Sequence, residues 1–177
     1  MIVRISTILL FFMFGCSHSD VHEEGGEIPL DDHLLINPKI IVYRDSQKVI
    51  ETNSQQLTKS NDDTQGALLT GNVVAHFFNE FGEHVSILQS DSARVEEITN
   101  NFEAYGHVIV KSDSGLTLQT NRIFWDHRNN YVFSKDSVMF TTSQMDTLIG
   151  TGFTSDIDLS NYTVNHPVGS TSRSLKK

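Results

Sequence analysis

The eight histidines are the residues of this chain best suited to acid–base or metal chemistry. Ligands of a structural zinc ion usually come in pairs that lie close together in the sequence. His76 and His84 flank one expected hairpin loop, and His107 and His127 flank another, so none of these four forms such a pair. The spacing therefore predicts histidines at the surface or at strand ends, and no metal site.

Other catalytic signatures are missing from the sequence, which has no Gly-x-Ser-x-Gly nucleophile elbow and no Walker loop. Glu96 and Glu97 are adjacent, so they would point to opposite faces of a strand and make a poor acid–base pair. The segment 150–152 begins like a dinucleotide motif, but Ser155 stands at the third glycine position, which favours a strand bend. We therefore expect no catalytic residues, no cofactor and no enzyme activity.

The net charge is −9, from 13 Lys+Arg against 22 Asp+Glu. An acidic chain of this kind is not attracted to polyanions, so we expect no nucleic-acid partner.

The single cysteine, Cys16, can form no internal disulfide, and its position indicates another role. It follows Arg4, the apolar run 5–14 and the small residue Gly15, an order typical of a secretory signal. The run is shorter than the ~20 apolar residues that a membrane-spanning helix needs. A cysteine at this point resembles the lipobox of bacterial lipoproteins. We expect cleavage after residue 15 and lipidation at Cys16, and an uncleaved N-terminal anchor is the alternative.

The remaining chain divides by composition into three parts. Residues 16–36 are polar and acidic with a Gly-Gly pair, which predicts a flexible, lipid-anchored tether. Residues 37–169 contain the strand and turn patterns of one folded domain. Residues 170–177 are expected to form a disordered basic tail.

A similar sequence pattern recurs three times in the folded part, about thirty residues apart. Each copy joins an apolar strand to a later, partly polar strand, and the copies are 71–75 with 88–91, 106–110 with 118–121, and 136–140 with 148–151. Leu88, Leu118 and Leu148 are 30 positions apart. A fixed period predicts units that bury their apolar faces only by stacking on their neighbours. Each unit here is a pair of strands.

The repeats predict an all-β fold of flattened, stacked antiparallel hairpins that form an open sandwich or a flattened barrel. We expect two neighbouring interior rows, one with Val73, Val108 and Val138 and the next with Ala75, Val110 and Phe140. Segments 39–43 and 162–164 are expected as edge strands. The pattern predicts one weaker strand over 48–57, and 89–98 could form a helical turn.

The stretch 102–126 combines a Gly-x-Val-x-Val strand, a Ser-x-x-Gly turn, a Leu-x-Thr strand and an Ile-x-Trp ending. This ordered set resembles the LptC family of periplasmic lipopolysaccharide-export proteins, in the OstA-like β-jellyroll superfamily. The resemblance covers about residues 37–169 and implies an OstA/LptA-like β-jellyroll. A soluble bridge protein of the LptA type shares this jellyroll, but Cys16 favours an anchored protein.

The resemblance implies lipopolysaccharide transport across the periplasm. The domain would accept lipopolysaccharide from an inner-membrane ABC transporter on its N-terminal side and pass it to an LptA-like bridge on its C-terminal side. Lipid A acyl chains would lie in an apolar groove, with the sugars outside, and the lipid anchor would hold the protein at the inner rather than the outer membrane. The residues expected to contact lipid are Val73, Phe77, Leu88, Val108, Val110, Leu118, Ile123, Trp125, Val138, Phe140 and Leu148.

The alternative is a structural or carbohydrate-binding surface lipoprotein with a closed β-sandwich. It predicts a filled interior, in which the same residues are plain core, and exposed aromatic side chains that can stack on sugars.

Overall fold

The computed structural model describes residues 32–60, 66–96, 98–144 and 146–170. These ranges contain strands and turns but no helix, so they include no helix that could cross a membrane. The expected signal segment 1–15, Cys16 and the tail beyond residue 170 lie outside the described residues.

Within the described ranges, twelve strands form one antiparallel sheet, which confirms the predicted all-β fold. Their bounds are β1 (Asp32–Ile36), β2 (Lys39–Arg44), β3 (Gln47–Asn53), β4 (Gln56–Ser60), β5 (Ala67–Phe78), β6 (His84–Val95), β7 (Phe102–Ser112), β8 (Thr117–Asp126), β9 (Tyr131–Thr141), β10 (Thr147–Asp156), β11 (Tyr162–Val164) and β12 (Val168–Ser170). From β5 to β10 each strand pairs with the next along the chain. The three sequence repeats are the hairpins β5–β6, β7–β8 and β9–β10.

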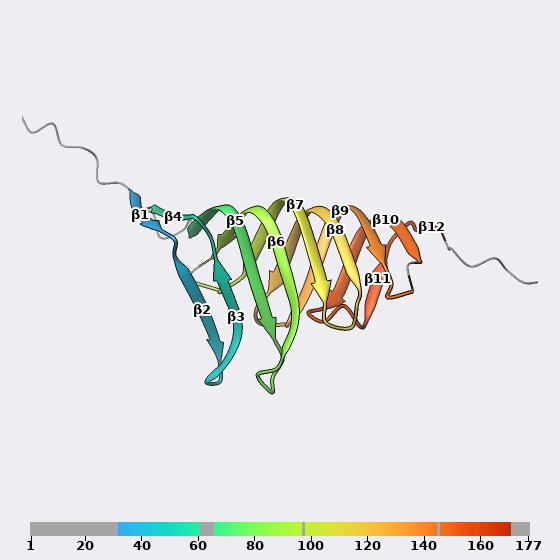
Figure 1. Ribbon diagram of the computed structural model, residues 1–177, viewed down its shortest axis with the longest axis horizontal. Helices are drawn as coiled ribbons and strands as arrows, with labels where there is room; N and C mark the ends of the chain where they lie inside the picture. The colour runs from blue at the N-terminus through green and yellow to red at the C-terminus, as the bar shows by residue number, and fades with distance from the viewer. Residues whose placement is uncertain (1–31, 61–65, 97, 145, 171–177) are drawn as a thin grey trace, which may run out of the picture. The chain divides into compact units, whose positions relative to one another are not determined.

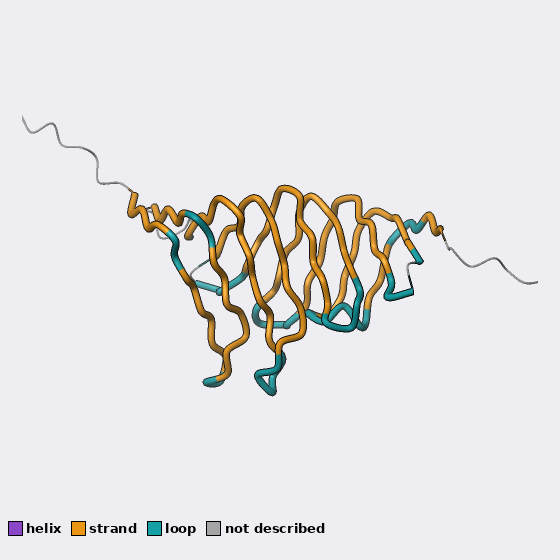
Figure 2. The backbone as a smooth tube through the Cα atoms, in the orientation of Figure 1, coloured by secondary structure: helices purple, strands orange, loops and turns teal. Residues whose placement is uncertain are grey.

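The long strands β5 to β10 run through two layers, because the sheet folds over along one edge (Figure 1). On one side of the fold, β3 pairs with residues 74–77 of β5 and β12 pairs with residues 147–149 of β10. On the other side, β4 pairs with residues 67–70 of β5 and β11 with residues 153–155 of β10. One layer therefore runs from β2 and β3 to β12, and the other from β1 and β4 to β11. Figure 2 shows the continuous strands curving between the layers.

The bends of β5 and β7 are built from consecutive residues with positive φ. Gly71 and Asn72 have φ of 77° and 47°, and Gly106 and His107 have φ of 78° and 46°. The pairing register shifts at both places, because left-handed residues insert extra backbone as in a β-bulge. Gly152 of β10, with φ of 85°, marks another register shift. Shifts in neighbouring strands let the whole sheet fold together.

Buried hydroxyl groups satisfy backbone carbonyls near the bends, where the ladder of hydrogen bonds is interrupted. Ser90 donates to the carbonyl of Ser92 at 3.0 Å. Thr120 donates to the carbonyl of Ser137 at 3.0 Å, and its oxygen lies 3.1 Å from the hydroxyl of Ser134. Both bonds to carbonyls are part-buried. A hydrogen bond of this kind contributes about 0.5–1.5 kcal/mol net, so small hydroxyl side chains stabilise the fold of the sheet at these points.

The inner face carries the predicted rows. Across the sheet, successive direct cross-strand partners form the row Ala75, Leu88, Val110, Leu118, Phe140 and Leu148. In the neighbouring row, Val108 and Val138 both lie opposite Thr120, and Val73 lies opposite Ser90. Since partners on one face of a sheet are in contact, the three hairpins share a continuous apolar interior.

The prediction of one strand over 48–57 is wrong. The chain forms β3 and β4 instead and passes between the layers at Ser54 and Gln55. The backbone N–H of Gln55 donates to the carbonyl of Gly71 at 2.9 Å, which ties this crossing to the bend of β5. No break is evident in the sequence, because Ser and Gln are common on exposed strands as well.

The suggestion of a helical turn over 89–98 is also wrong, since β6 continues to Val95. The Ser-Asp-Ser sequence at 90–92 has the composition of a turn, and it bends the strand without ending it. The sheet also begins earlier than expected, with β1 at Asp32, inside the segment 16–36 that was predicted as tether.

Substitution of Gly106 by Ala tests the folded sheet. A Cβ at Gly106 would overlap a carboxylate oxygen of Asp91 and lie 2.9 Å from the Cβ of Asp91. We expect G106A to lower the free energy of unfolding by roughly 2–4 kcal/mol, from strain at positive φ plus this overlap. Urea denaturation measures the loss.

The matched control is G82A in the β5–β6 loop. Gly82 has a similar φ of 79°, but its nearest neighbour, the Oε1 atom of Gln47, would lie 3.4 Å from the added Cβ. We expect a loss of only about 1 kcal/mol, from φ strain alone. Equal losses in the two variants would show that the bend is not tightly packed.

Candidate functional site

The middle of the interior is filled by its own side chains. Of the eleven residues expected to contact lipid, all but Leu148 are at most 3% exposed, and Leu148 is half-buried. The ring of Phe77 packs edge-on against Trp125 at 5.5 Å between centroids, and Phe140 lies 5.7 Å from Phe153. In this conformation these residues form a core, so a lipid chain could enter the middle only if the two layers moved apart.

The interior is open at the end formed by β1 to β4. A cavity of about 450 Å³ lies there, lined by Leu35, Ile40, Ile41, Val42, Tyr43, Leu57, Lys59, Ala67, Val95 and Asn100. Leu34, Leu35 and Ile36 of β1 are 57%, 53% and 62% exposed. We call this opening the N-terminal mouth. Its apolar lining continues into the core, because Ile40 and Val42 pack against the core cluster.

Sequence reasoning identified 39–43 as an edge strand but did not place these residues in the site. A usable signal was present in the strand itself. Ile40 and Val42 alternate with Ile41 and Tyr43, so β2 is apolar on both faces although it lies at an edge. An edge strand of this kind exposes apolar surface unless another molecule covers it.

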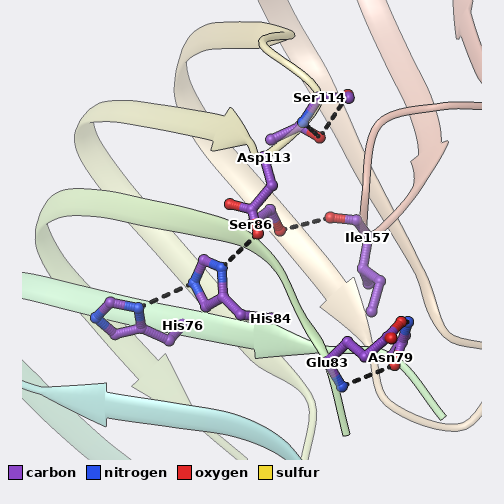
Figure 3. Close-up of polar contacts among 9 residues, drawn as sticks. His76, Asn79, Glu83, His84, Ser86, Asp113, Ser114 and Ile157 are labelled. Atoms are coloured by element: carbon purple, nitrogen blue, oxygen red, sulfur yellow. Dashed lines mark hydrogen bonds and ion pairs between the residues drawn. The ribbon is translucent and has the colours of Figure 1, made fainter. Parts of the chain in front are cut away.

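At the end of β10 a tight turn links the two layers. Ile157 and Leu159 of this turn are buried, and the hydroxyl of Ser86 in β6 donates to the carbonyl of Ile157 at 2.6 Å (Figure 3). Burial of Asp156 opposes its ionisation, but hydrogen bonds with Asp158, Asn161 and Ser160 outweigh this effect and lower the pKa of Asp156 to about 2. The turn therefore keeps a stable ionised carboxylate and holds the layers together near the C-terminal end.

Aromatic side chains also gather on the outer face of β8 and β9. Phe124 and Phe133 are direct cross-strand partners, and their rings stack at 5.0 Å with an interplanar angle of 12°. Tyr131 lies 5.6 Å from Phe133. A cavity of about 440 Å³ adjoins these rings, and its lining is Arg94, Glu96, Asn101, Phe102, Glu103, Phe124, Trp125, Asp126, Tyr131 and Phe133. We call Phe124, Tyr131 and Phe133 the outer aromatic platform.

Two ionisable side chains near this cavity, Asp126 and His127, have lowered pKa values. Hydrogen bonds from Asn129 lower the pKa of Asp126, which keeps that carboxylate ionised. Burial, followed by the charge of Arg44, lowers the pKa of His127. The indole N–H of Trp125 is buried and has no hydrogen-bond partner. Since such a donor costs about 1–3 kcal/mol when unpaired, an acceptor oxygen of a ligand that reached it would gain a hydrogen bond.

No protein-family model matches this chain, and no curated protein matches it either. The function must therefore be argued from the interior, its mouth and the outer face.

The packing of the interior can be tested by truncating Phe140, which is fully buried and has Tyr162 4.0 Å away between ring centroids. We expect F140A to reduce the free energy of unfolding by about 3–5 kcal/mol, because it removes a core ring and leaves a cavity. The control L148A, at a half-buried position of the same row, should cost roughly 1–2 kcal/mol. Denaturant titration gives both values, and a cost below about 1 kcal/mol for F140A would indicate an open channel at this position.

Proposed function

We propose that this protein carries lipopolysaccharide across the periplasm by binding its lipid A acyl chains between the two layers of the sheet. The observation that carries the proposal is the N-terminal mouth, where exposed apolar side chains lead directly into continuous apolar rows. Acyl chains enter at the mouth and advance as the layers separate along the edge opposite the bends. The resemblance of residues 102–126 to LptC proteins supports the same cargo.

The energetics favour a conduit rather than a storage site. Burial of each acyl CH₂ group contributes about 0.8 kcal/mol, so full burial of several chains would bind too tightly for release. The filled interior opposes binding, because the core side chains must give up contacts to admit a lipid. This opposing cost lowers the net affinity of the protein for lipid into a range that allows transfer of the lipid to the next protein. Handover to a second jellyroll of similar interior is then close to isoenergetic.

Both ends of the sheet provide edges for partner strands. β1 and β2 end the layers on the N-terminal side, and β11 and β12 end them on the C-terminal side. An exposed edge can accept a strand from a partner by β-augmentation. By the resemblance, the inner-membrane transporter joins the N-terminal edge and an LptA-like bridge joins the C-terminal edge. A lipid anchor at Cys16 would keep the mouth near the inner membrane, so the protein would serve outer-membrane biogenesis from there.

Site-specific photo-crosslinking in living cells tests the cargo and its route. A photoreactive residue at Val42 in the mouth, or at half-buried Leu148 in the interior row, is expected to form lipopolysaccharide adducts. The control position is Gln89, which is exposed on the outer face. Absence of adducts at both Val42 and Leu148, in variants that fold normally, would rule out this function.

A second candidate function, carbohydrate binding on the outer face of a sandwich with a filled core, is favoured by two observations. The core is filled, and the outer aromatic platform stands beside a cavity with carboxylate, guanidinium and amide groups. Sugar rings stack on aromatic faces while such polar groups hydrogen-bond their hydroxyls.

Isothermal titration calorimetry tests this candidate. The ligand is the core oligosaccharide of lipopolysaccharide, from which lipid A has been removed. Carbohydrate binding predicts measurable affinity that F133A weakens roughly tenfold, because the stacked ring is lost. The control F78A removes an outer aromatic ring of β5 that does not line this cavity, and it should leave the affinity unchanged. A wild-type protein that does not bind the oligosaccharide would contradict the candidate.

A further inference from the structure

Two histidines that lie apart in the sequence meet on the outer face of the β5–β6 hairpin. The Nδ1 atom of His76 in β5 lies 3.1 Å from the Nε2 atom of His84 in β6. The Nδ1 atom of His84 lies 2.8 Å from a carboxylate oxygen of Asp113 in the β7–β8 turn. Figure 3 shows the three side chains in line, from β5 and β6 to the β7–β8 turn. None of this chemistry is used by the proposed transport.

The local backbone brings these groups together and holds them. A register shift between Phe77 and Phe78 displaces the pairing of the hairpin, so that His84 lies opposite Phe78 and its ring reaches His76. Bulges of this kind re-aim side chains. The backbone N–H of Asp113 donates to the carbonyl of Val85 at 3.0 Å, which places the backbone of Asp113 next to β6 and its carboxylate within reach of His84.

The side chain of Asn79 makes the hairpin loop rigid. Its Oδ1 accepts hydrogen bonds from the backbone N–H groups of Phe81 and Glu83, each at 3.0 Å. Its Nδ2 donates to the carboxylate of Glu83 at 2.9 Å. The two histidine-bearing strands therefore have a defined relative position at this end of the sheet.

We propose that His76 and His84 form a binding site for a divalent transition-metal ion such as Zn²⁺, Ni²⁺ or Cu²⁺. An ion about 2.0–2.1 Å from both nitrogens, at their 3.1 Å separation, would see them at an angle of about 100°, between the square-planar and tetrahedral values. Imidazole nitrogen suits these ions. Both side chains are only part-buried, so the rings can turn toward a shared ion.

Asp113 acts from outside the coordination sphere. A metal-binding histidine usually donates its second ring N–H to a carboxylate, which fixes the tautomer and makes the ligand nitrogen more basic. A hydrogen bond from Nδ1 of His84 to Asp113 does this and leaves Nε2 for the metal. In the described ranges, no group of three or more His, Cys, Asp or Glu side chains is placed to hold a metal, so water completes the sphere.

The charges around the pair permit a cation. Glu51 lies opposite His76 on β3, but its carboxylate is paired with the ammonium groups of Lys39 at 2.8 Å and Lys48 at 3.1 Å. Lys48 also lies over the ring of Phe78, 3.9 Å from its centroid. Asp113 therefore remains as the negative charge that balances a metal beside His84.

Titration of Zn²⁺ into the full-length protein, followed by calorimetry and by thermal unfolding, tests the site. We expect binding of one ion that H76N and H84Q each weaken at least tenfold, and that D113N weakens about 10–100-fold. The melting temperature should rise with Zn²⁺ in the wild type and rise less in these variants. Electron paramagnetic resonance of the Cu²⁺ form should show two coordinated imidazole nitrogens that H76N or H84Q reduces in number.

The control is H107N. His107 contacts the carboxylate of Asp91 at 2.7 Å, which reproduces the His84–Asp113 pair without a second imidazole. We expect H107N to bind Zn²⁺ like the wild type. The proposal fails if H76N and H84Q, confirmed as folded by circular dichroism, bind Zn²⁺ and gain thermal stability as the wild type does. It also fails if the wild type binds no Zn²⁺.

Discussion

The fold depends on one constraint, which is that the long strands must bend without ending. If they ended, each layer would be a separate sheet with its own edges; since they continue, both layers belong to one sheet and share one interior. Left-handed residues such as Gly71 and Gly106 make the bends possible, and buried hydroxyls such as Thr120 keep the interrupted backbone hydrogen-bonded. The layers are thus joined along one edge by continuous backbone, and the proposed transport requires them to separate along the opposite edge.

That arrangement connects packing with the proposed transport. The core is dense at its centre and open at the N-terminal mouth, where β1 and β2 expose apolar side chains. A lipid that entered there would meet tighter packing toward the centre, so each step inward would exchange protein contacts for lipid contacts. The turn at Asp156 restrains this opening near the far end, because Ser86 and Ile157 join the layers there.

Much of the fold could be predicted from the sequence because its signals are repeated. The period of 30 identified the hairpins, and alternation identified the inner face, including the row through Val110 and Phe140. The bends were harder to recognise, since Gly-Asn and Ser-Asp-Ser segments have the same composition in turns as in bulged strands. The break of 48–57 into β3 and β4 depends on which layer each half joins, and this is a long-range contact that local pattern does not contain.

The candidate site could be predicted only in part, because it also depends on long-range contacts. Ten of the eleven expected residues do face the interior and are nearly fully buried, but whether they line a channel or fill a core depends on the separation of the layers. The pairing of His76 with His84 depends on a register shift in β6, so sequence spacing did not indicate it.

The most direct test of the central claim is native mass spectrometry of the full-length protein extracted gently from membranes. Lipopolysaccharide transport predicts a population with one bound lipopolysaccharide molecule and acylation at Cys16, whereas protein that is consistently free of lipid A would contradict it.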